Sequence, residues 1–481
     1  LIHHEMNRCI TCYRCERFYK DYAGGKDFGA QASRDRVFFG RQKDGVLENE
    51  FSGNLVEVCP TGVFTDKPFL AHYSRKWDLQ SAPSICFGCG VGCNTAPGER
   101  YGQLKRIHNR YNYDINGYFI CDRGRFGAGY VNNPERIDFA GLREKEGSFS
   151  AIRHENALST LASWLNNKHV VGIGSPRASL ESNFLLKRWL GPSNFSSGLS
   201  CSEASRMKEL VKILSSTSAK VPSVRQMESA DAILILGEDV ANTAPRISLA
   251  LRQAVRNESF SMAEKAGIPE WQDAAVRNLG QDERSPLVLV TSCETRLDDV
   301  ASHIYTLNPD AIADFGFSLA TKLDGNDIED EIVCKVADML LQADRPLIIS
   351  GIGAFHPDIL FSADKVADAL RKSNKETMLS LCVSESNSMG VAMLSDEHTL
   401  SMTEIVDQLD QIDTLVILEN DLSRRIDGIA LQKLADSKVD IISLDVLEND
   451  TLNLSSMVLP AASFAESEGT LINFEGRAQR Y

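Results

Sequence analysis

From residue 151 onward, the chain alternates continuous apolar runs with amphipathic stretches. Seven apolar runs begin at His169, Asp231, Pro286, Pro346, Thr377, Asp413 and Val439, as in DAILILG and PLIISGIG. Between them, segments such as 179–190, 243–255 and 327–341 place apolar residues at helical spacing. Continuous apolar strands separated by helices are typical of parallel sheets that are covered on both faces. We therefore expect a doubly wound α/β architecture, divided into two subdomains around a loop-rich stretch at 257–285.

The first 150 residues lack this alternation and carry eight of the twelve cysteines. The other four stand in apolar contexts and look like small core residues: Cys201, Cys293, Cys334 and Cys382. The eight early cysteines are therefore the candidate ligands, and their spacing separates them into two sets.

The first set consists of Cys9, Cys12, Cys15 and Cys59. Its first three members follow C-x2-C-x2-C, in which a tight loop directs successive sulfur atoms at one cubane cluster. A ferredoxin continues at once with Cys-Pro, whereas here that pair comes much later, as Cys59-Pro60. A triplet and one remote cysteine supply the four ligands of one [4Fe-4S] cluster. Two nearby residues are alternative ligands, His3 and His4, although four cysteines already satisfy a cube.

The second set consists of Cys86, Cys89, Cys93 and Cys121. The spacing is C-x2-C-x3-C-x27-C, so one loop supplies three thiolates and a later segment supplies the fourth. We interpret this as a second [4Fe-4S] site. Zinc is one alternative, although four-cysteine zinc sites usually consist of two separated C-x2-C pairs. A disulfide is another, and it would require an oxidising compartment and a geometry that neighbouring loop cysteines rarely reach.

Length and charge restrict the classes of function. A chain of 481 residues exceeds one hydrophobic core, so two or three domains are expected. The net charge of −15 argues against binding to nucleic acid or to an anionic membrane surface. No uncharged apolar run reaches the ~18 residues that a membrane span needs. The chain begins with Leu1 rather than methionine and ends at Tyr481, so we expect an internal piece of a longer protein.

Three domains follow from these patterns. Residues 1–80 are expected to form a loop-rich, ferredoxin-like domain whose cluster serves as its core, and residues 81–145 a second [4Fe-4S] domain. Turn residues and alternation at 97–112 predict a small antiparallel sheet in the second domain. GLREKEGSF, residues 141–149, is predicted to be a polar linker, and 146–481 the α/β domain. The strand-end loops of that domain are where a ligand would bind, but neither GIGSPR nor GIGAFH completes a dinucleotide fingerprint.

Several stretches together resemble one family. They are CITCYRC with the distant CPTG, the cysteine block at 86–121, CDRGRFGAGYVN, IGSPRASLESN, LGEDV and SFAESEGTLINFEGRAQR. In combination they look like the large iron-sulfur subunit, known as the G subunit, of bacterial respiratory complex I, the NADH:quinone oxidoreductase. The α/β part of that family is similar to molybdopterin oxidoreductases such as formate dehydrogenases.

The resemblance implies a role for each cysteine set. The first would bind the [4Fe-4S] cluster on the main electron path, and the second an additional [4Fe-4S] cluster off that path. The chain would relay electrons from NADH and flavin toward quinone within a proton-translocating respiratory enzyme, with no catalytic residue of its own and no molybdopterin. A [2Fe-2S] centre and a further [4Fe-4S] cluster are expected in an N-terminal part absent here.

The same resemblance implies partners and a place in the cell. The expected partners are other peripheral-arm subunits, namely the flavin- and NADH-binding subunit and a ferredoxin-like subunit. The expected location is peripheral, at the cytoplasmic face of the bacterial inner membrane.

A catalytic subunit of a molybdopterin-dependent oxidoreductase is the alternative hypothesis. Its features are the cluster loop before the α/β region and the stretch SEGTLINFEGR. However, the lysine that such enzymes place after the last cluster cysteine is replaced by Arg123, and the sequence stops before their C-terminal pterin-clamping domain. Cys201 would then be a relic metal ligand, and otherwise a core or surface thiol.

Overall fold

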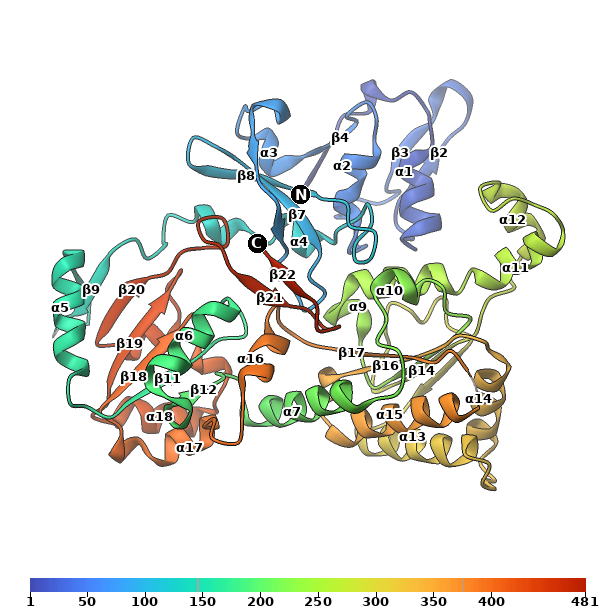
Figure 1. Cartoon of the computed structure of the whole chain (residues 1–481). Coiled ribbons are helices and arrows are strands. Elements are labelled where there is room, and N and C mark those ends of the chain that lie inside the picture. The colour runs from blue at the N-terminus through green and yellow to red at the C-terminus, as the bar shows by residue number, and fades with distance from the viewer. Residues whose placement is uncertain (145–146, 374) are drawn as a thin grey trace. The chain divides into compact units, whose positions relative to one another are not determined.

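The computed structural model describes residues 1–144, 147–373 and 375–481, which form two compact units. Unit 1 combines Leu1–Gly127 with Ile213–Ser384, and unit 2 combines Ala128–Lys212 with Glu385–Tyr481. Each unit contains one sheet of the α/β region (Figure 1). The domain limit predicted between residues 145 and 146 lies outside the described residues.

The N-terminal part of unit 1 is built from short elements. Its strands and helices are β1 (Ile2–His4), α1 (Arg14–Glu16), the π-helix η2 (Arg17–Tyr22), β2 (Gly29–Gln31), β3 (Phe38–Gly40), η4 (Ser52–Asn54), α2 (Leu55–Val58), β4 (Phe64–Asp66) and α3 (Lys67–Leu70). Strand β1 pairs with β4, and β2 with β3, both antiparallel. Tyr19, Phe39, Phe51 and Leu55 are fully buried in one cluster. Cys15 belongs to the same cluster, and Cys9 and Cys59 pack against it, so a metal cluster held by them would adjoin an aromatic core.

A small antiparallel sheet follows in unit 1. It consists of β5 (Gln80–Ser81), β6 (Ser84–Ile85), β7 (Asn94–Arg100) and β8 (Gln103–Asn109), and α4 (Asp122–Phe126) comes after it. Strands β7 and β8 pair from Thr95 with Asn109 to Arg100 with Gln103. The antiparallel pair predicted at 97–112 is confirmed.

The larger sheet of unit 1 has five parallel strands in the order β15-β14-β13-β16-β17. The strands are β13 (Ala232–Leu236), β14 (Leu287–Thr291), β15 (His303–Thr306), β16 (Pro346–Gly351) and β17 (Met378–Cys382). The accompanying helices are α8 (Val224–Met227), α9 (Val240–Thr243), α10 (Pro245–Ala254), α11 (Asn257–Lys265), α12 (Asp273–Gly280), α13 (Pro309–Leu323), α14 (Glu331–Gln342) and α15 (Pro357–Lys372). The chain runs from β13 outward to β14 and β15, and then returns to the other side of β13 with β16. The switch point of the sheet therefore lies between β13 and β16.

Unit 2 contains a seven-stranded sheet in the order β10-β9-β20-β19-β18-β11-β12. The strands are β9 (Ala140–Arg143), β10 (Phe149–Ile152), β11 (Val170–Ile173), β12 (Phe195–Ser196), β18 (Thr414–Leu418), β19 (Asp440–Asp445) and β20 (Met457–Pro460). The helices are α5 (His154–Leu165), α6 (Leu180–Leu190), α16 (Ser388–Leu394), α17 (Met402–Asp407) and α18 (Gly428–Asp436), and α7 (Cys201–Ser216) crosses from unit 2 into unit 1 in sequence. A hairpin of β21 (Thr470–Ile472) and β22 (Ala478–Arg480) follows.

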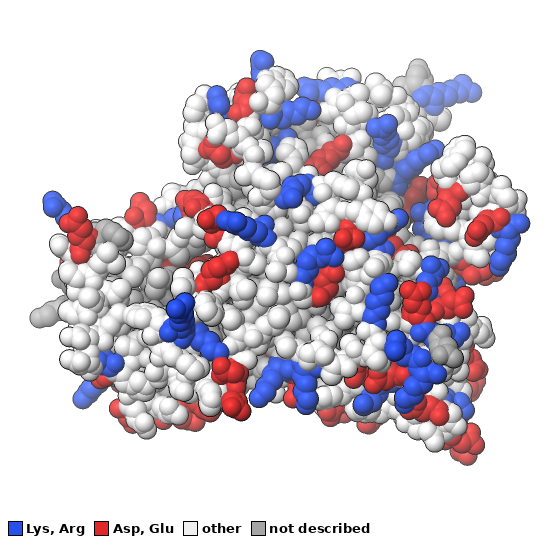
Figure 2. Space-filling view, viewed as in Figure 1, with Lys and Arg blue, Asp and Glu red and all other residues white. Residues whose placement is uncertain are grey.

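All seven predicted apolar runs form strands, which confirms the α/β fold class with parallel sheets. Two local predictions were wrong. The stretch predicted as a polar linker contributes β9 and β10, which pair antiparallel at the edge of the unit 2 sheet. The stretch 257–285, predicted as loop-rich, contains helices α11 and α12. Acidic and basic side chains are interspersed over the face drawn in Figure 2.

Candidate iron-sulfur centres

The first cysteine set lines one cavity of unit 1, together with Ile10, Tyr13 and Phe64. Three of its cysteines come from the turn before and within α1, where Thr11 and Tyr13 have positive φ angles of 57° and 59°. Cys59 follows α2 directly. The left-handed turn folds the loop back, so three successive sulfur atoms face the one that α2 supplies.

Exposure within the first set is graded. Cys15 is buried, Cys9 and Cys59 are half-buried, and Cys12 is exposed. Burial raises the pKa of the Cys15 thiol to about 12, with the neighbouring Cys12 and Cys59 adding to the rise. Burial also acts to raise the pKa of Cys59, but backbone N–H groups of the loop after it outweigh burial and lower it. One of these N–H groups belongs to Val63 and donates to Cys59 Sγ at 3.3 Å.

The second cysteine set is buried throughout. Cys86, Cys89 and Cys93 lie on the loop between β6 and β7, and Cys121 occupies the position directly before α4. None of the four is more than 9% exposed. Burial raises the pKa of Cys93 well above its usual value, and the charges of the other three cysteines add to this rise. Four thiolates cannot share such a place without positive charge, so the set requires a metal partner to be stable as thiolates.

Backbone geometry brings the second set together. The N–H of Cys86 donates to the carbonyl of Cys93 at 2.8 Å, which closes the loop on itself. The N–H of Gly88 donates to Cys86 Sγ at 3.3 Å. A side chain at Gly124 would place its Cβ 3.0 Å from Cys86 Sγ. Glycine in the first turn of α4 therefore leaves room for the sulfur atoms.

Hydrogen bonds and one ion pair join the scaffolds of the two sets. The guanidinium of Arg125 on α4 donates to Glu57 on α2 at 2.9 Å, and the Arg125 side chain has no exposed surface. It also donates to Asn54 at 3.1 Å. Asn54 in turn donates to the carbonyl of Ile120 at 2.8 Å. Helix α2 ends next to Cys59 and α4 begins next to Cys121, so these contacts hold the two remote ligands in fixed positions.

The separation of the ligand sulfur atoms distinguishes a site for one metal ion from a site for a cubane cluster. Around one zinc ion with Zn–S distances of about 2.3 Å, tetrahedral thiolates lie only ~3.8 Å apart. Within residues 1–144, 147–373 and 375–481, no group of three or more His, Cys, Asp or Glu side chains is arranged to hold one metal ion. A cubane separates its four ligand sulfur atoms more widely, because each sulfur binds a different corner.

Comparison with known proteins agrees with this organisation. Residues 1–65 match the family model of the NADH-quinone oxidoreductase subunit 3 ferredoxin-like domain. Residues 79–133 match the molybdopterin oxidoreductase Fe4S4 domain, and residues 136–481 match the molybdopterin oxidoreductase model. The chain belongs to the molybdopterin oxidoreductase family. The Fe4S4 domain of this family contains the whole second cysteine set, and the ferredoxin-like match contains the whole first set.

Within this family the chain is similar over its full length to the G subunit of NADH-quinone oxidoreductase. It is 46% identical to that subunit from Pseudomonas fluorescens and 44% identical to that from Escherichia coli K12, with 100% of this chain covered in both. The resemblance found in the sequence is confirmed. The chain spans about half the length of these relatives, namely 53% and 54%.

Solved structures support the fold alone. The formyltransferase/hydrolase complex from Methylorubrum extorquens aligns with a TM-score of 0.50 and 13% sequence identity. The alignment covers 71% of this chain and 92% of that chain. At this identity the similarity shows a shared chain path and carries no information on activity.

The family name implies a molybdopterin, so we tested the fit at the strand ends of unit 2. The Asn420 amide donates to the carbonyls of Gly174 and Gly198 at 2.8 and 2.9 Å, which fastens the loops after β18, β11 and β12 to one another. Arg425 donates to both carboxylate oxygens of Glu385 at 2.8 and 3.0 Å. These two side chains are engaged by contacts within the chain, which does not favour a pterin at this place.

The four later cysteines behave differently from the prediction that they are core residues. Cys382 is buried, Cys201 and Cys334 are half-buried, and Cys293 is exposed, so the prediction was wrong for Cys293. Cys201 Sγ lies 2.8 Å from the hydroxyl of Thr403 and accepts from its N–H at 3.3 Å. Its position is explained by these contacts. The role of Cys201 as a relic ligand gains no support from them.

Sequence reasoning missed one buried acid. Glu238 lies two residues after β13, beyond Gly237, and is 1% exposed; its loop was expected at a strand end, but the acid itself was not singled out. The signal was present, because a carboxylate just after a fully apolar strand lies where ligands of α/β sheets bind. The loops that follow β13 and β16 meet in unit 1, where the N–H of Gly353 donates to Glu238 at 3.0 Å.

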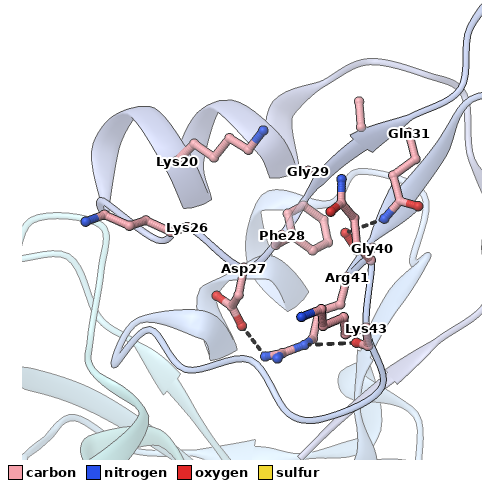
Figure 3. A pocket seen from close by; sticks show the side chains of 11 residues that line it. Lys20, Lys26, Asp27, Phe28, Gly29, Gln31, Gly40, Arg41 and Lys43 are labelled. Atoms are coloured by element: carbon pink, nitrogen blue, oxygen red, sulfur yellow. Dashed lines mark hydrogen bonds and ion pairs between the residues drawn. The ribbon is translucent and has the colours of Figure 1, made fainter.

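A further cavity of unit 1 lies beside the β2–β3 hairpin (Figure 3) and has a volume of about 260 Å³. Basic side chains line it, among them Lys20, Lys26 and Arg41. Arg41 pairs with Asp27, and Lys20 donates to Glu16 at 2.9 Å. Two of these charges are therefore paired within the chain. Across the described residues, no helix combines the length and apolarity needed to cross a membrane.

Proposed function

We propose that this chain is the electron-relaying part of a G subunit of NADH:quinone oxidoreductase and carries two [4Fe-4S] clusters. Cys9, Cys12, Cys15 and Cys59 would hold one cluster, and Cys86, Cys89, Cys93 and Cys121 the other. The observation that carries this proposal is the presence of two four-cysteine sets. In each set, one short segment supplies three cysteines and a remote position supplies the fourth. A bound cubane supplies one-electron transfer with little rearrangement.

The residues of the chain would serve as holders and insulators rather than as acids or bases. The aromatic cluster of Tyr19, Phe39 and Phe51 packs behind the first set and excludes water. Backbone N–H groups donate to the sulfur atoms of Cys9, Cys59 and Cys86 and would raise the reduction potential. No residue of this chain is proposed to be catalytic. The complex to which it belongs would be the enzyme.

Exposure supports different roles for the two sets. Cys12 is exposed and its neighbour Ile10 is 63% exposed, so a redox partner can approach the first set closely. The second set lies below the surface. This difference supports a first cluster in the main electron path and a second cluster to one side of it. The proposed partners are the flavin- and NADH-binding subunit and a ferredoxin-like subunit of the peripheral arm, at the cytoplasmic face of the inner membrane.

Relatives about twice as long support further cofactors outside this chain. We propose that the remaining polypeptide carries the expected [2Fe-2S] centre and one more [4Fe-4S] cluster, and that no molybdopterin binds to the present domain. The competing hypothesis, a catalytic molybdopterin enzyme, rests on the match of residues 136–481 to that family. The contacts of Asn420 and Arg425 argue against it.

Metal analysis of the anaerobically reconstituted chain tests the proposal. We expect about eight iron and about eight sulfide per chain, no stoichiometric zinc and no molybdenum. Replacement of Cys59 by Ala should remove about four irons and one EPR signal, and Cys121→Ala should remove the other signal. Cys293→Ala is the matched control, because this exposed cysteine belongs to neither set. Stoichiometric zinc with little iron would contradict the cluster assignment. Molybdenum bound to the chain would favour the hypothesis of a catalytic molybdopterin enzyme.

A further inference from the structure

Glu238 occupies the switch point of the five-stranded sheet. It is the first residue beyond the turn at Gly237, and its carboxylate lies against the loop that follows β16. In α/β folds this place usually receives a ligand. Here a carboxylate of the chain itself fills it, with only 1% of the residue exposed.

Two glycines make room for this carboxylate. A Cβ at Gly351 would lie 2.1 Å from Glu238 Oε2, and a Cβ at Gly353 would lie 2.6 Å from Oε1. Any side chain at either position would therefore displace the acid. The GIG sequence after β16, which superficially resembles a dinucleotide loop, is explained by the space that Glu238 needs.

Glu238 is connected to the surface by one hydroxyl group. Thr243 on α9 is half-buried, and its Oγ1 donates to Glu238 Oε1 at 2.5 Å. A hydroxyl group both donates and accepts, so it can pass a proton from water to the carboxylate. The N–H of Gly353, by contrast, only donates a hydrogen bond and cannot accept a proton from water.

The loop that carries Glu238 is tied to the second cysteine set. Arg123, two residues after Cys121, donates to the carbonyl of Gly88 at 3.3 Å and to that of Asn242 at 2.9 Å. Gly88 lies between Cys86 and Cys89, and Asn242 directly precedes Thr243. Arg123 therefore links the loop that carries Glu238 and Thr243 to the loop that carries Cys86 and Cys89.

We infer that Glu238 is a proton-binding site coupled to the second cluster, taking up one proton when that cluster is reduced. This inference rests on the proposed cluster at the second set. One electron arrives from a reduced iron-sulfur partner, and one proton moves from water through the Thr243 hydroxyl to Glu238 Oε1. The negative charge added by the electron is balanced by the proton, so the net charge of this buried region is unchanged.

The surrounding groups favour such a transfer. Burial raises the pKa of the Glu238 carboxyl, Thr243 and Gly353 oppose the rise by donating to the carboxylate, and the negative charge of Asp239 adds to it. Cys382 faces the carboxylate from β17, and Arg123 is the cation that reaches the same loop from α4. An added negative charge on the cluster would raise the proton affinity of Glu238 further, because like charges in a low dielectric disfavour each other.

The test is a redox titration of the full-length protein, followed by the EPR signal of the second cluster at several pH values. Over the range in which Glu238 protonates on reduction, the midpoint potential should fall as pH rises, at up to about 59 mV per tenfold change in proton concentration. Glu238→Gln should abolish this slope, whereas Glu238→Asp should retain one. Asp364→Asn, which removes a carboxyl on α15, is the matched control and should retain the wild-type slope.

Infrared difference spectroscopy of the wild-type protein gives a readout that does not require a variant. Reduction of the second cluster should produce a new band of a protonated carboxyl group. A pH-independent midpoint potential in the wild type, a wild-type slope in Glu238→Gln, or a reduced wild-type protein without the carboxyl band overturns the inference. Each of these results would leave the two proposed clusters in place, since it requires their EPR signals.

Discussion

The ion pair between Arg125 and Glu57 should stabilise both cysteine sets at once. Replacement of Arg125 by Met keeps much of the aliphatic volume and removes the charge. The Arg125 side chain is completely buried, and Glu57, which is 24% exposed, would keep only His108 and the N–H of Asn109 as partners. Breaking a buried pair from one side costs about 3–5 kcal/mol, because the remaining charge is left incompletely compensated.

The size of unit 1 converts this cost into a measurable shift. For a domain of several hundred residues, 1 kcal/mol corresponds to roughly 2 °C, so Arg125→Met should lower the Tm by about 6–10 °C. The iron content of both sets should fall together on mild heating, because α2 ends at Cys59 and α4 begins after Cys121. A cysteine variant, by contrast, should remove one set alone.

The assay is thermal unfolding followed by circular dichroism, with both EPR signals recorded on the same samples. Removing both charges, in Arg125→Met with Glu57→Gln, should cost less than Arg125→Met alone. Arg8→Met is the control, because its partner Glu5 is on the surface and such pairs contribute about 0–1 kcal/mol. An unchanged Tm in Arg125→Met, or loss of only one EPR signal, would refute the proposal that this ion pair stabilises both cysteine sets.

Three further predictions concern stability and metal content. Glu466→Gln should make the stability of unit 2 slightly less sensitive to acid. A hydrogen bond from Arg136 lowers the pKa of Glu466 to about 2. The pair therefore contributes its full stabilisation above about pH 4.5 and loses it as the pH falls toward 2. Glu466 is 44% exposed, so the effect should not exceed about 1 kcal/mol in acid titrations followed by fluorescence. Leu55→Ala should cost about 2–5 kcal/mol in denaturant unfolding, because this fully buried side chain leaves a cavity beneath the first set. Cys201→Ala should leave iron content unchanged within error, since Thr403 is its contact; a loss of metal would contradict this.

Continuous burial made much of the α/β region predictable. Strands such as β13 and β16 are buried at every position, and their sequences are uninterrupted apolar runs. Strand β15 was missed because it lies at the sheet edge, where its residues, HIYT, are alternately half-buried and exposed. Helices α11 and α12 bury few residues each, so their polar sequences were interpreted as loop.

The cysteine sets were predictable because ligand spacing is local for three of every four members. Their difference in exposure was not, since it depends on how β6, β7 and α4 fold around the second set. The buried acid Glu238 was also missed, because its environment is built by glycines more than a hundred residues away. A carboxylate next to a strand becomes informative only when the opposing loop is known.

The most direct test of the central claim compares Cys12→Ala with Cys89→Ala in the assembled complex. The measurement is NADH-to-quinone turnover, normalised to flavin content. If the exposed first cluster lies in series in the electron path, Cys12→Ala should abolish turnover even where the complex assembles, while Cys89→Ala should keep turnover per flavin and act mainly through stability. Equal loss in both variants would contradict the series-and-side arrangement, and full activity in Cys12→Ala would remove this chain from the main electron path.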